Sequence, residues 1–183
     1  MKRKRVWVVL TCLILVLGMF GLTGCGADSD KTEPGNEIEV TEQDYRVALF
    51  FANEEYVALG DESLEKYMVY ESEITSMPGD AYFDALELLK TIPEEGYGTL
   101  ITDKIKFNDV YLDGDTVYVD LDSNGLSGGS LEESYLVGQV VNTLINSFDE
   151  VKQVQFLIDG EVRESLMGHI DATSPFTKDV FAE

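Results

Sequence analysis

The chain of 183 residues is poor in side chains that support metal or thiol chemistry. It has two cysteines, Cys12 and Cys25, and one histidine, His169. A lone histidine does not form a zinc site without other strong ligands, and two cysteines do not make a disulfide framework. Carboxylates are so numerous that adjacent pairs of them arise by chance, so such pairs do not indicate glycosidase chemistry. We therefore predict that the protein is not an enzyme and needs no cofactor.

Basic residues are also scarce, and they are unevenly placed. The chain has 13 lysines and arginines against 35 acidic residues. Four of the basic residues lie in Lys2 to Arg5, so the chain beyond residue 25 has 9 basic and 35 acidic residues, a net charge of −26. This charge excludes nucleic acid as a partner and excludes electrostatic docking on anionic lipid. It favours a solvated, self-repelling surface; a cationic ligand or partner is the narrower alternative.

Only one long hydrophobic run is present, Val6 to Phe20, and it follows the basic residues directly. The run is shorter than the ~20 residues that a membrane-spanning helix prefers. A basic segment followed by a short apolar core is typical of a signal peptide. The alternative is an uncleaved anchor.

The next residues, Leu22, Thr23, Gly24 and Cys25, resemble a bacterial lipobox. The resemblance implies cleavage after Gly24 and lipidation of Cys25, which would leave no free thiol in the mature chain. We therefore expect a protein held at the extracytoplasmic face of the cell membrane by lipid on Cys25, because two or more acyl chains anchor stably. The alternative is an ordinary signal peptide that is followed by a chance cysteine.

The remaining residues predict one domain with short flanking segments. Residues 1–24 are the predicted signal peptide, and residues 25–43 are the lipidated cysteine and a polar, acidic, flexible tether. Residues 44–170 are the predicted domain, and residues 171–183 are a C-terminal tail. The chain is long enough for a single hydrophobic core without disulfides.

Hydrophobic periodicity predicts the elements of the domain. Strands are expected at residues 46–53, which read as buried on both faces, and at residues 67–74. A helix capped by Asp80 is expected from Ala81 to about Thr91, with Ile92 on its apolar side, and a β-hairpin is expected over residues 104–122 around Asp113 and Gly114.

A second, longer helix is expected, and the other predicted elements are arranged around it. Ser130 and Glu133 have the spacing of a capping box. The apolar residues that follow recur at helical spacing: Val137, Val140, Val141, Leu144 and Phe148. Gln139, Asn142 and Asn146 fall mostly on the other faces, and a strand over residues 151–158 comes next. The order ββαββαβ predicts a single compact α+β domain, with one sheet and both helices packed on one face of it.

The ordered pattern of these elements resembles the GerMN domain of sporulation and germination lipoproteins of Gram-positive bacteria. The resemblance spans roughly residues 46–168, in a single copy where GerM-type proteins can have two. The residues that match are 51–53, 81–89, 113–114, 117–121, 139–144, 154, 156 and 159–160. The resemblance implies a non-enzymatic, envelope-facing module with a fold similar to the ring-building motifs of secretion assemblies.

An acidic stretch beside the second helix is a weak candidate for a calcium site. Asp120, Asp122, Asn124 and Gly125 resemble the first half of an EF-hand loop. The twelfth position of that loop should be glutamate but is Leu131. We therefore expect no metal, and a polar turn between a strand and a helix is the favoured interpretation.

Aromatic residues offer the other candidate surface. Tyr56 and Tyr67 flank a polar loop, and Tyr97 lies between two glycines. Exposed tyrosines would suit contact with a protein or a glycan, whereas buried ones would cover the edge of the core.

The sequence thus predicts a lipid-anchored binding or assembly module of the bacterial envelope, with an envelope protein or peptidoglycan as partner and a role in sporulation or germination. The alternative is a cell-wall hydrolase or a wall-glycan binder that uses surface carboxylates and aromatics. An enzyme should bury two acids in one cleft. A binding module should show an exposed aromatic patch or an open sheet edge.

Overall fold

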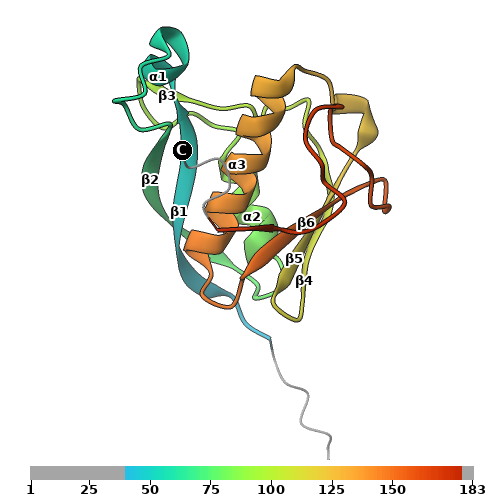
Figure 1. The fold of residues 1–183 in the computed structure, drawn as a ribbon. Helices are drawn as coiled ribbons and strands as arrows, with labels where there is room; N and C mark the ends of the chain where they lie inside the picture. Colours follow the sequence, from blue (N-terminus) through green and yellow to red (C-terminus); the bar gives the residue numbers. More distant parts are fainter. Residues whose placement is uncertain (1–39, 179–183) are drawn as a thin grey trace, which may run out of the picture. The chain divides into compact units, whose positions relative to one another are not determined.

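Two β-sheets and three α-helices are present in residues 40–178, the part of the chain that the computed structural model describes (Figure 1). The α+β class is confirmed, and these residues belong to one compact unit. The predicted signal peptide, lipobox and Cys25 lie outside the described residues, as does most of the predicted tether. Within residues 40–178, no helix combines the length and apolar character needed to cross a membrane.

The first sheet has the order β2-β1-β3 and is antiparallel. Strand β1 (Gln43–Asn53) pairs with β2 (Tyr67–Ser76) over ten residues and with the short β3 (Tyr97–Gly98) only at its end. Side chains of β1 alternate, so that Val47 is buried whereas Phe50 is half-buried. The expectation that this strand is buried on both faces is wrong, because only one face of the sheet lies on the core.

The second sheet has the order β4-β5-β6-β7. Strands β4 (Phe107–Asp113) and β5 (Thr116–Leu121) form the predicted hairpin, in which Gly114 has the positive φ of 65° that the turn requires. Strand β6 (Gln153–Ile158) runs parallel to β5, because a helix crosses over between them. Strand β7 (Phe176–Thr177) lies in the segment predicted as the C-terminal tail and pairs with β6.

One of the three helices was not predicted, and the other two differ from their predictions near their ends. Helix α1 (Glu54–Leu59) occupies a segment predicted as a polar connection, and the Asn53 side chain caps it by accepting from the backbone N–H groups of residues 55 and 56. Helix α2 (Ala81–Leu88) ends before Thr91, which leaves Ile92 49% exposed rather than on a buried face. The Asp80 side chain makes no capping hydrogen bond.

Helix α3 (Ser130–Ser147) has a different cap from the one predicted. The N-cap is Gly129, and the Glu132 carboxylate accepts a hydrogen bond from the Gly129 N–H at 3.0 Å. Glycine has no side chain with which to return the bond, so only half of a capping box forms. The prediction of Ser130 and Glu133 is therefore off by one residue, and Glu133 is free to serve another purpose.

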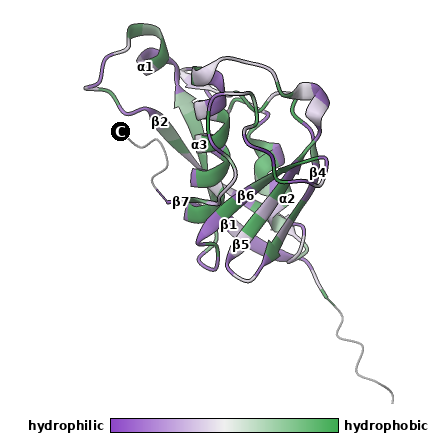
Figure 2. Cartoon of the chain, turned by 45° about the vertical axis from the view of Figure 1, so that its right-hand side comes forward, coloured by the Kyte–Doolittle hydropathy of each residue, from purple (hydrophilic) through white to green (hydrophobic). Residues whose placement is uncertain are grey.

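Helix α3 lies between the two sheets rather than on one face of a single sheet (Figure 1). Its predicted apolar stripe is buried in the core together with residues from both sheets, and Figure 2 shows hydrophobic residues along α3 and the neighbouring strands. The core residues of α3 and its C-cap are Leu136, Val137, Val140, Val141, Leu144 and Phe148.

Polar side chains of α3 explain why the strands form two sheets instead of the expected one. Ser147 Oγ accepts from the Ala48 N–H at 3.0 Å, and Thr143 Oγ1 accepts from the Phe50 N–H at 3.0 Å. Gln139 Nε2 donates to the Phe50 carbonyl oxygen at 3.2 Å. These bonds occupy the edge of β1 that another strand would need, because each backbone group must find a partner when buried. Gln139 was predicted on a face of the helix away from the apolar stripe, and at this position that face is also fully buried, against β1.

Candidate functional site

The outer edge of β2 is open, and it borders the candidate site. Because the backbones of Ala48 and Phe50 bond to α3, the residues opposite them on β2, Glu71 and Val69, direct their own N–H and C=O groups away from β1. Among the described residues, no strand pairs with this edge. The Tyr97 hydroxyl reaches the Val69 carbonyl oxygen at 3.5 Å, which is long for a hydrogen bond of this type.

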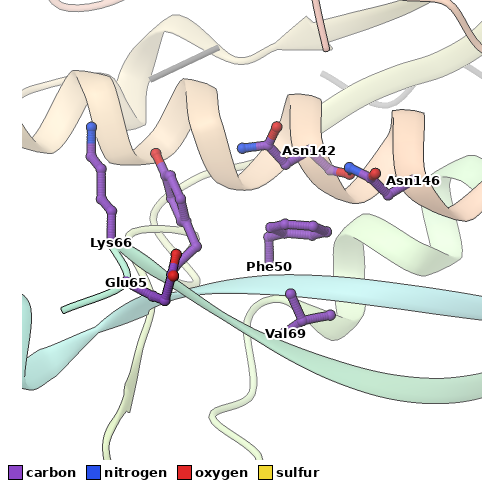
Figure 3. A pocket seen from close by; sticks show the side chains of 7 residues that line it. Phe50, Glu65, Lys66, Val69, Asn142 and Asn146 are labelled. Atoms are coloured by element: carbon purple, nitrogen blue, oxygen red, sulfur yellow. The ribbon is translucent and has the colours of Figure 1, made fainter. Parts of the chain in front are cut away.

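A groove lies between the first half of β2 and helix α3, with a volume of about 200 Å³. In Figure 3, Asn142 and Asn146 project from α3 above Phe50 of β1, and Val69 of β2 lies below it. Glu65, Lys66 and Tyr67 complete the lining at one end. The groove therefore has an apolar floor and polar walls, an arrangement typical of sites that bind a side chain or a small polar group.

The second half of the same face is acidic. Glu71 and Glu73 are exposed on β2 and line a shallow depression with Arg46 and Ser72. Arg46 Nε lies 3.6 Å from a Glu73 carboxylate oxygen, with both side chains more than three-quarters exposed. An ion pair with this exposure is weak and easily rearranged. The face thus changes from apolar and aromatic to acidic along β2.

Tyr67 lies in an aromatic cluster between Phe50 of β1 and Tyr135 of α3. Its ring makes edge contacts with Phe50 and Tyr135, with centroid distances of 6.5 and 5.5 Å. A Cβ at Gly138 would lie 1.9 Å from the Tyr67 hydroxyl oxygen, so the glycine permits this close approach. The Lys66 ammonium lies 5.7 Å from the centre of the Tyr67 ring and 5.4 Å from that of Tyr135, within the range of cation–π attraction.

Burial shifts the pKa values of two side chains in this cluster. Desolvation raises the pKa of the Tyr67 hydroxyl above its ordinary value, and the nearby hydroxyls of Tyr135 and Tyr56 raise it further. Desolvation also lowers the pKa of Lys66. Tyr67 therefore remains a neutral hydrogen-bond donor at physiological pH.

The structure separates the three tyrosines of the predicted contact surface. Tyr56 and Tyr67 lie near each other, as their electrostatic interaction shows, and Tyr67 lines the groove. Tyr97 instead packs edge-on against Phe51 and Tyr70 on the opposite, core-facing side of the first sheet. None of the three is fully exposed. A role in contact stays a prediction, and the geometry points to Tyr67 as the best placed of the three.

The acidic stretch after β5 uses its oxygens within the chain. Asp122 Oδ1 accepts from both the backbone and the side-chain nitrogen of Asn124 at 2.7 Å, and Asp120 Oδ1 accepts from the Gly160 N–H at 2.9 Å. The hydrogen bonds to Asn124 lower the pKa of Asp122. In residues 40–178, no group of three metal-binding side chains converges on one point. The stretch forms a 3₁₀ turn, residues Ser123–Gly125, before α3.

Glu133 holds a loop that sequence reasoning did not connect to α3. It is 0% exposed, and its carboxylate accepts from the backbone N–H groups of Leu166, Met167 and His169 at 2.8–3.0 Å. His169 Nδ1 lies 3.2 Å from the same carboxylate. Because every oxygen of this carboxylate is engaged, Glu133 fixes the loop that follows β6.

A serine motif precedes α3. Residues Gly125–Gly129 spell G-x-S-x-G around Ser127, a pattern that in hydrolases places the serine at a sharp turn between strand and helix. Here Ser127 is exposed in a loop three residues before α3 begins, and no hydrogen bond joins it to His169 within the described chain. This segment therefore matches the sequence motif but lacks the geometry of a nucleophile elbow.

Sequence reasoning missed six of the seven residues that line the groove, all except Tyr67: Phe50, Glu65, Lys66, Val69, Asn142 and Asn146. Phe50 was assigned to a strand buried on both faces, and the two asparagines were assigned to the helix faces away from the apolar stripe. The spacing of Asn142 and Asn146 is the signal that could have linked these two residues, because residues four apart lie on one side of a helix.

A comparison with models of known protein families identifies the family of this chain. A family model described as Germane, sporulation and spore germination, matches residues 48–164, more than half of the chain. The chain belongs to this family. The predicted resemblance to GerMN domains is thereby confirmed, and the Germane description names a process rather than a reaction. No curated protein sequence matches the chain.

Three solved structures share the Germane fold with this chain. A candidate lipoprotein from Clostridium perfringens is 15% identical with a TM-score of 0.51, over 77% of this chain and 91% of that one. The first GerMN domain of the sporulation protein GerM from Bacillus subtilis is 15% identical with a TM-score of 0.53, over 73% and 97%. The tandem GerMN domains of GerM are 17% identical with a TM-score of 0.53, over 82% and 49%. This chain therefore spans about half of the tandem.

Proposed function

We propose that this Germane-family protein is a lipid-anchored binding module at the extracytoplasmic face of the cell membrane, with an envelope protein as its partner in sporulation or germination. The single observation that carries the binding role is the open edge of β2 with the groove beside it. An open edge and an aromatic groove are the features expected of a binding module. The lipobox-like residues 22–25 and the similarity to a candidate lipoprotein support the anchoring.

The acidic side chains give less support to a hydrolase. An enzyme that works through carboxylates should bury two acids in one cleft. In the described residues, Glu133 is the one carboxylate that is buried, and backbone donors occupy it. The acids of the β2 face, Glu71 and Glu73, are exposed. The distribution of acids therefore favours a surface that attracts a partner over a site that cleaves a substrate.

The anchoring is tested by changing the predicted lipidation site. Cys25→Ala should release the protein into the soluble fraction or leave it as a larger, unprocessed precursor, because the acyl chains on Cys25 provide the attachment of the mature protein. Cys12→Ala is the matched control, since it changes the other cysteine inside the predicted signal peptide. Cell fractionation with immunoblotting measures both. If Cys25→Ala left both the size of the processed protein and its membrane attachment unchanged, the anchor would not be lipid on Cys25.

The binding role is tested by site-specific photo-cross-linking in intact cells. A photoreactive residue at Val69, which is 43% exposed beside the groove, should capture a recurrent envelope protein. The same residue at Tyr111, 40% exposed on β4 of the other sheet, is the matched control and should not capture it. Equal products from both positions would contradict a binding site on the β2 face. Capture of wall fragments without a protein would favour the glycan alternative.

A further inference from the structure

The open edge of β2 has a chemistry that specifies its occupant. We propose that this edge accepts an extended segment of the partner as an added β-strand, and that the segment has one apolar side chain followed at alternate positions by two basic side chains. This inference rests on the proposed binding function and names the kind of partner that the β2 face would recognise.

The backbone of β2 is arranged for strand addition. Val69 and Glu71 direct their N–H and C=O groups outward, and strand alternation extends this to Glu73. The pairing of β2 with β1 runs from Tyr67 to Ser76 without a register shift. A regular strand of this length offers a continuous row of hydrogen-bonding groups to an incoming chain.

The other long edge strand is protected, which singles out β2. Strand β4 is shorter, and its register shifts between Phe107 and Asp109. An irregularity of this kind disrupts the ladder and discourages pairing at an edge. The remaining edge strands, β3 and β7, have two residues each. Within residues 40–178, β2 is therefore the edge on which a strand can pair over several residues.

The side chains on the outer face define the sequence of the added strand. A residue paired with Val69 would lie beside the half-exposed Val69 side chain, which forms part of the apolar floor of the groove, and this suits an apolar side chain. Residues paired with Glu71 and Glu73 would face exposed carboxylates, and opposite charges on neighbouring strands attract. Arg46 is the one basic residue lining this part of the face, and its exposed side chain can move aside.

Charge and size disfavour other occupants. Two copies of β2 paired antiparallel about Ser72 would place Glu71 and Glu73 of one copy opposite Glu73 and Glu71 of the other, and like charges directly opposite repel. The net charge of −26 beyond residue 25 adds to this repulsion. A groove of about 200 Å³ accepts side chains but not a helix, whose diameter is about 10 Å.

Synthetic peptides test the proposal against the full-length protein in detergent. In the first peptide, valine, lysine and lysine occupy alternate positions in this order, with threonine between them. The second peptide has the reverse sequence. In the control peptides, glutamate replaces each lysine. One of the lysine peptides should bind, more weakly as salt increases, and should slow amide exchange at Val69 and Glu71. Fluorescence anisotropy measures the affinity, and hydrogen exchange locates the site.

Paired variants separate strand addition from general charge attraction. Val69→Pro removes an outward N–H and should weaken binding about tenfold, since proline is tolerated at a strand edge but cannot donate. Glu71→Lys with Glu73→Lys should weaken it about tenfold as well. Asp109→Lys with Asp113→Lys makes the same charge change on exposed residues of β4 and should leave binding within about twofold.

The results distinguish this inference from the proposed function. Equal binding by the lysine and glutamate peptides would overturn the inference, as would insensitivity to both β2 changes or concentration-dependent dimerisation through β2. A partner captured from Val69 in cells, together with failure of the peptides, would overturn strand addition and leave the binding role intact. Failure of capture from Val69 would overturn the binding role itself.

Discussion

Glu133→Ala should lower the free energy of unfolding by about 3 kcal/mol or more. The substitution removes the buried acceptor of three backbone N–H groups, those of Leu166, Met167 and His169. A buried donor without a partner costs about 1–3 kcal/mol, and the loop can recover part of this by exposing its amides to water. Urea unfolding measures the total effect. Hydrogen exchange at these three amides should accelerate first, because they lose the carboxylate directly.

Two variants control for the loss of charge and of helix contacts. Glu133→Gln keeps the shape and one acceptor oxygen, and it should cost about half as much as Glu133→Ala. Glu132→Ala makes the same change one residue earlier, where the exposed side chain bonds only the Gly129 N–H, and should cost about 1 kcal/mol or less. If Glu132→Ala were as destabilising as Glu133→Ala, the buried carboxylate would not be the main support of the loop.

Gln139→Met should lower the free energy of unfolding by about 2–4 kcal/mol. Methionine has a similar shape and helix propensity, so the change mainly removes hydrogen bonds. Gln139 Oε1 accepts from the Leu100 N–H at 2.8 Å, and Nε2 donates to the Phe50 carbonyl oxygen at 3.2 Å. Both backbone groups would lose their partner at a site where the side chain is 0% exposed. Each such loss costs about 1–3 kcal/mol.

Thermal and urea unfolding of Gln139→Met should be compared with Asn146→Ala. Asn146 is on the same helix but is exposed, and its side chain bonds only the Asn142 carbonyl oxygen within α3. Removal of the Asn146 side chain should change the free energy of unfolding by about 0.5 kcal/mol or less. Near-neutral behaviour of Gln139→Met would mean that Gln139 does not help to hold the edge of β1, and that only Thr143 and Ser147 of α3 occupy it.

The sequence predicted what depends on neighbouring residues. The apolar stripe Val137 to Phe148, the turn at Gly114 and the alternation of β5 are local patterns, and the structure contains each of them. The predictions were wrong where one local sequence pattern was compatible with two structures. Both Ser130 with Glu133 and Gly129 with Glu132 have the spacing of a cap, and only the second pair forms one.

The candidate site was less accessible to sequence reasoning. Tyr67 was predicted as a contact residue and lines the groove, whereas Phe50 and Val69 were assigned only to strands. The groove exists because α3 lies along β1, and that packing brings together residues from three separate segments. Tyr97 was grouped with Tyr67 on exposure alone, but alternation along the paired strands places the two on opposite faces of the sheet.

By itself, the sequence determined the α+β class, the order of the main elements, the acidic surface and the resemblance to the GerMN family. Tertiary structure decided which strands pair, why there are two sheets and which strand edge stays open. The physical reason is distance along the chain. Hydrogen bonds from α3 to β1 join residues 89 to 99 positions apart, and no local pattern in either segment specifies the other. The buried partners of Gln139 and Glu133 therefore become visible only in the folded chain.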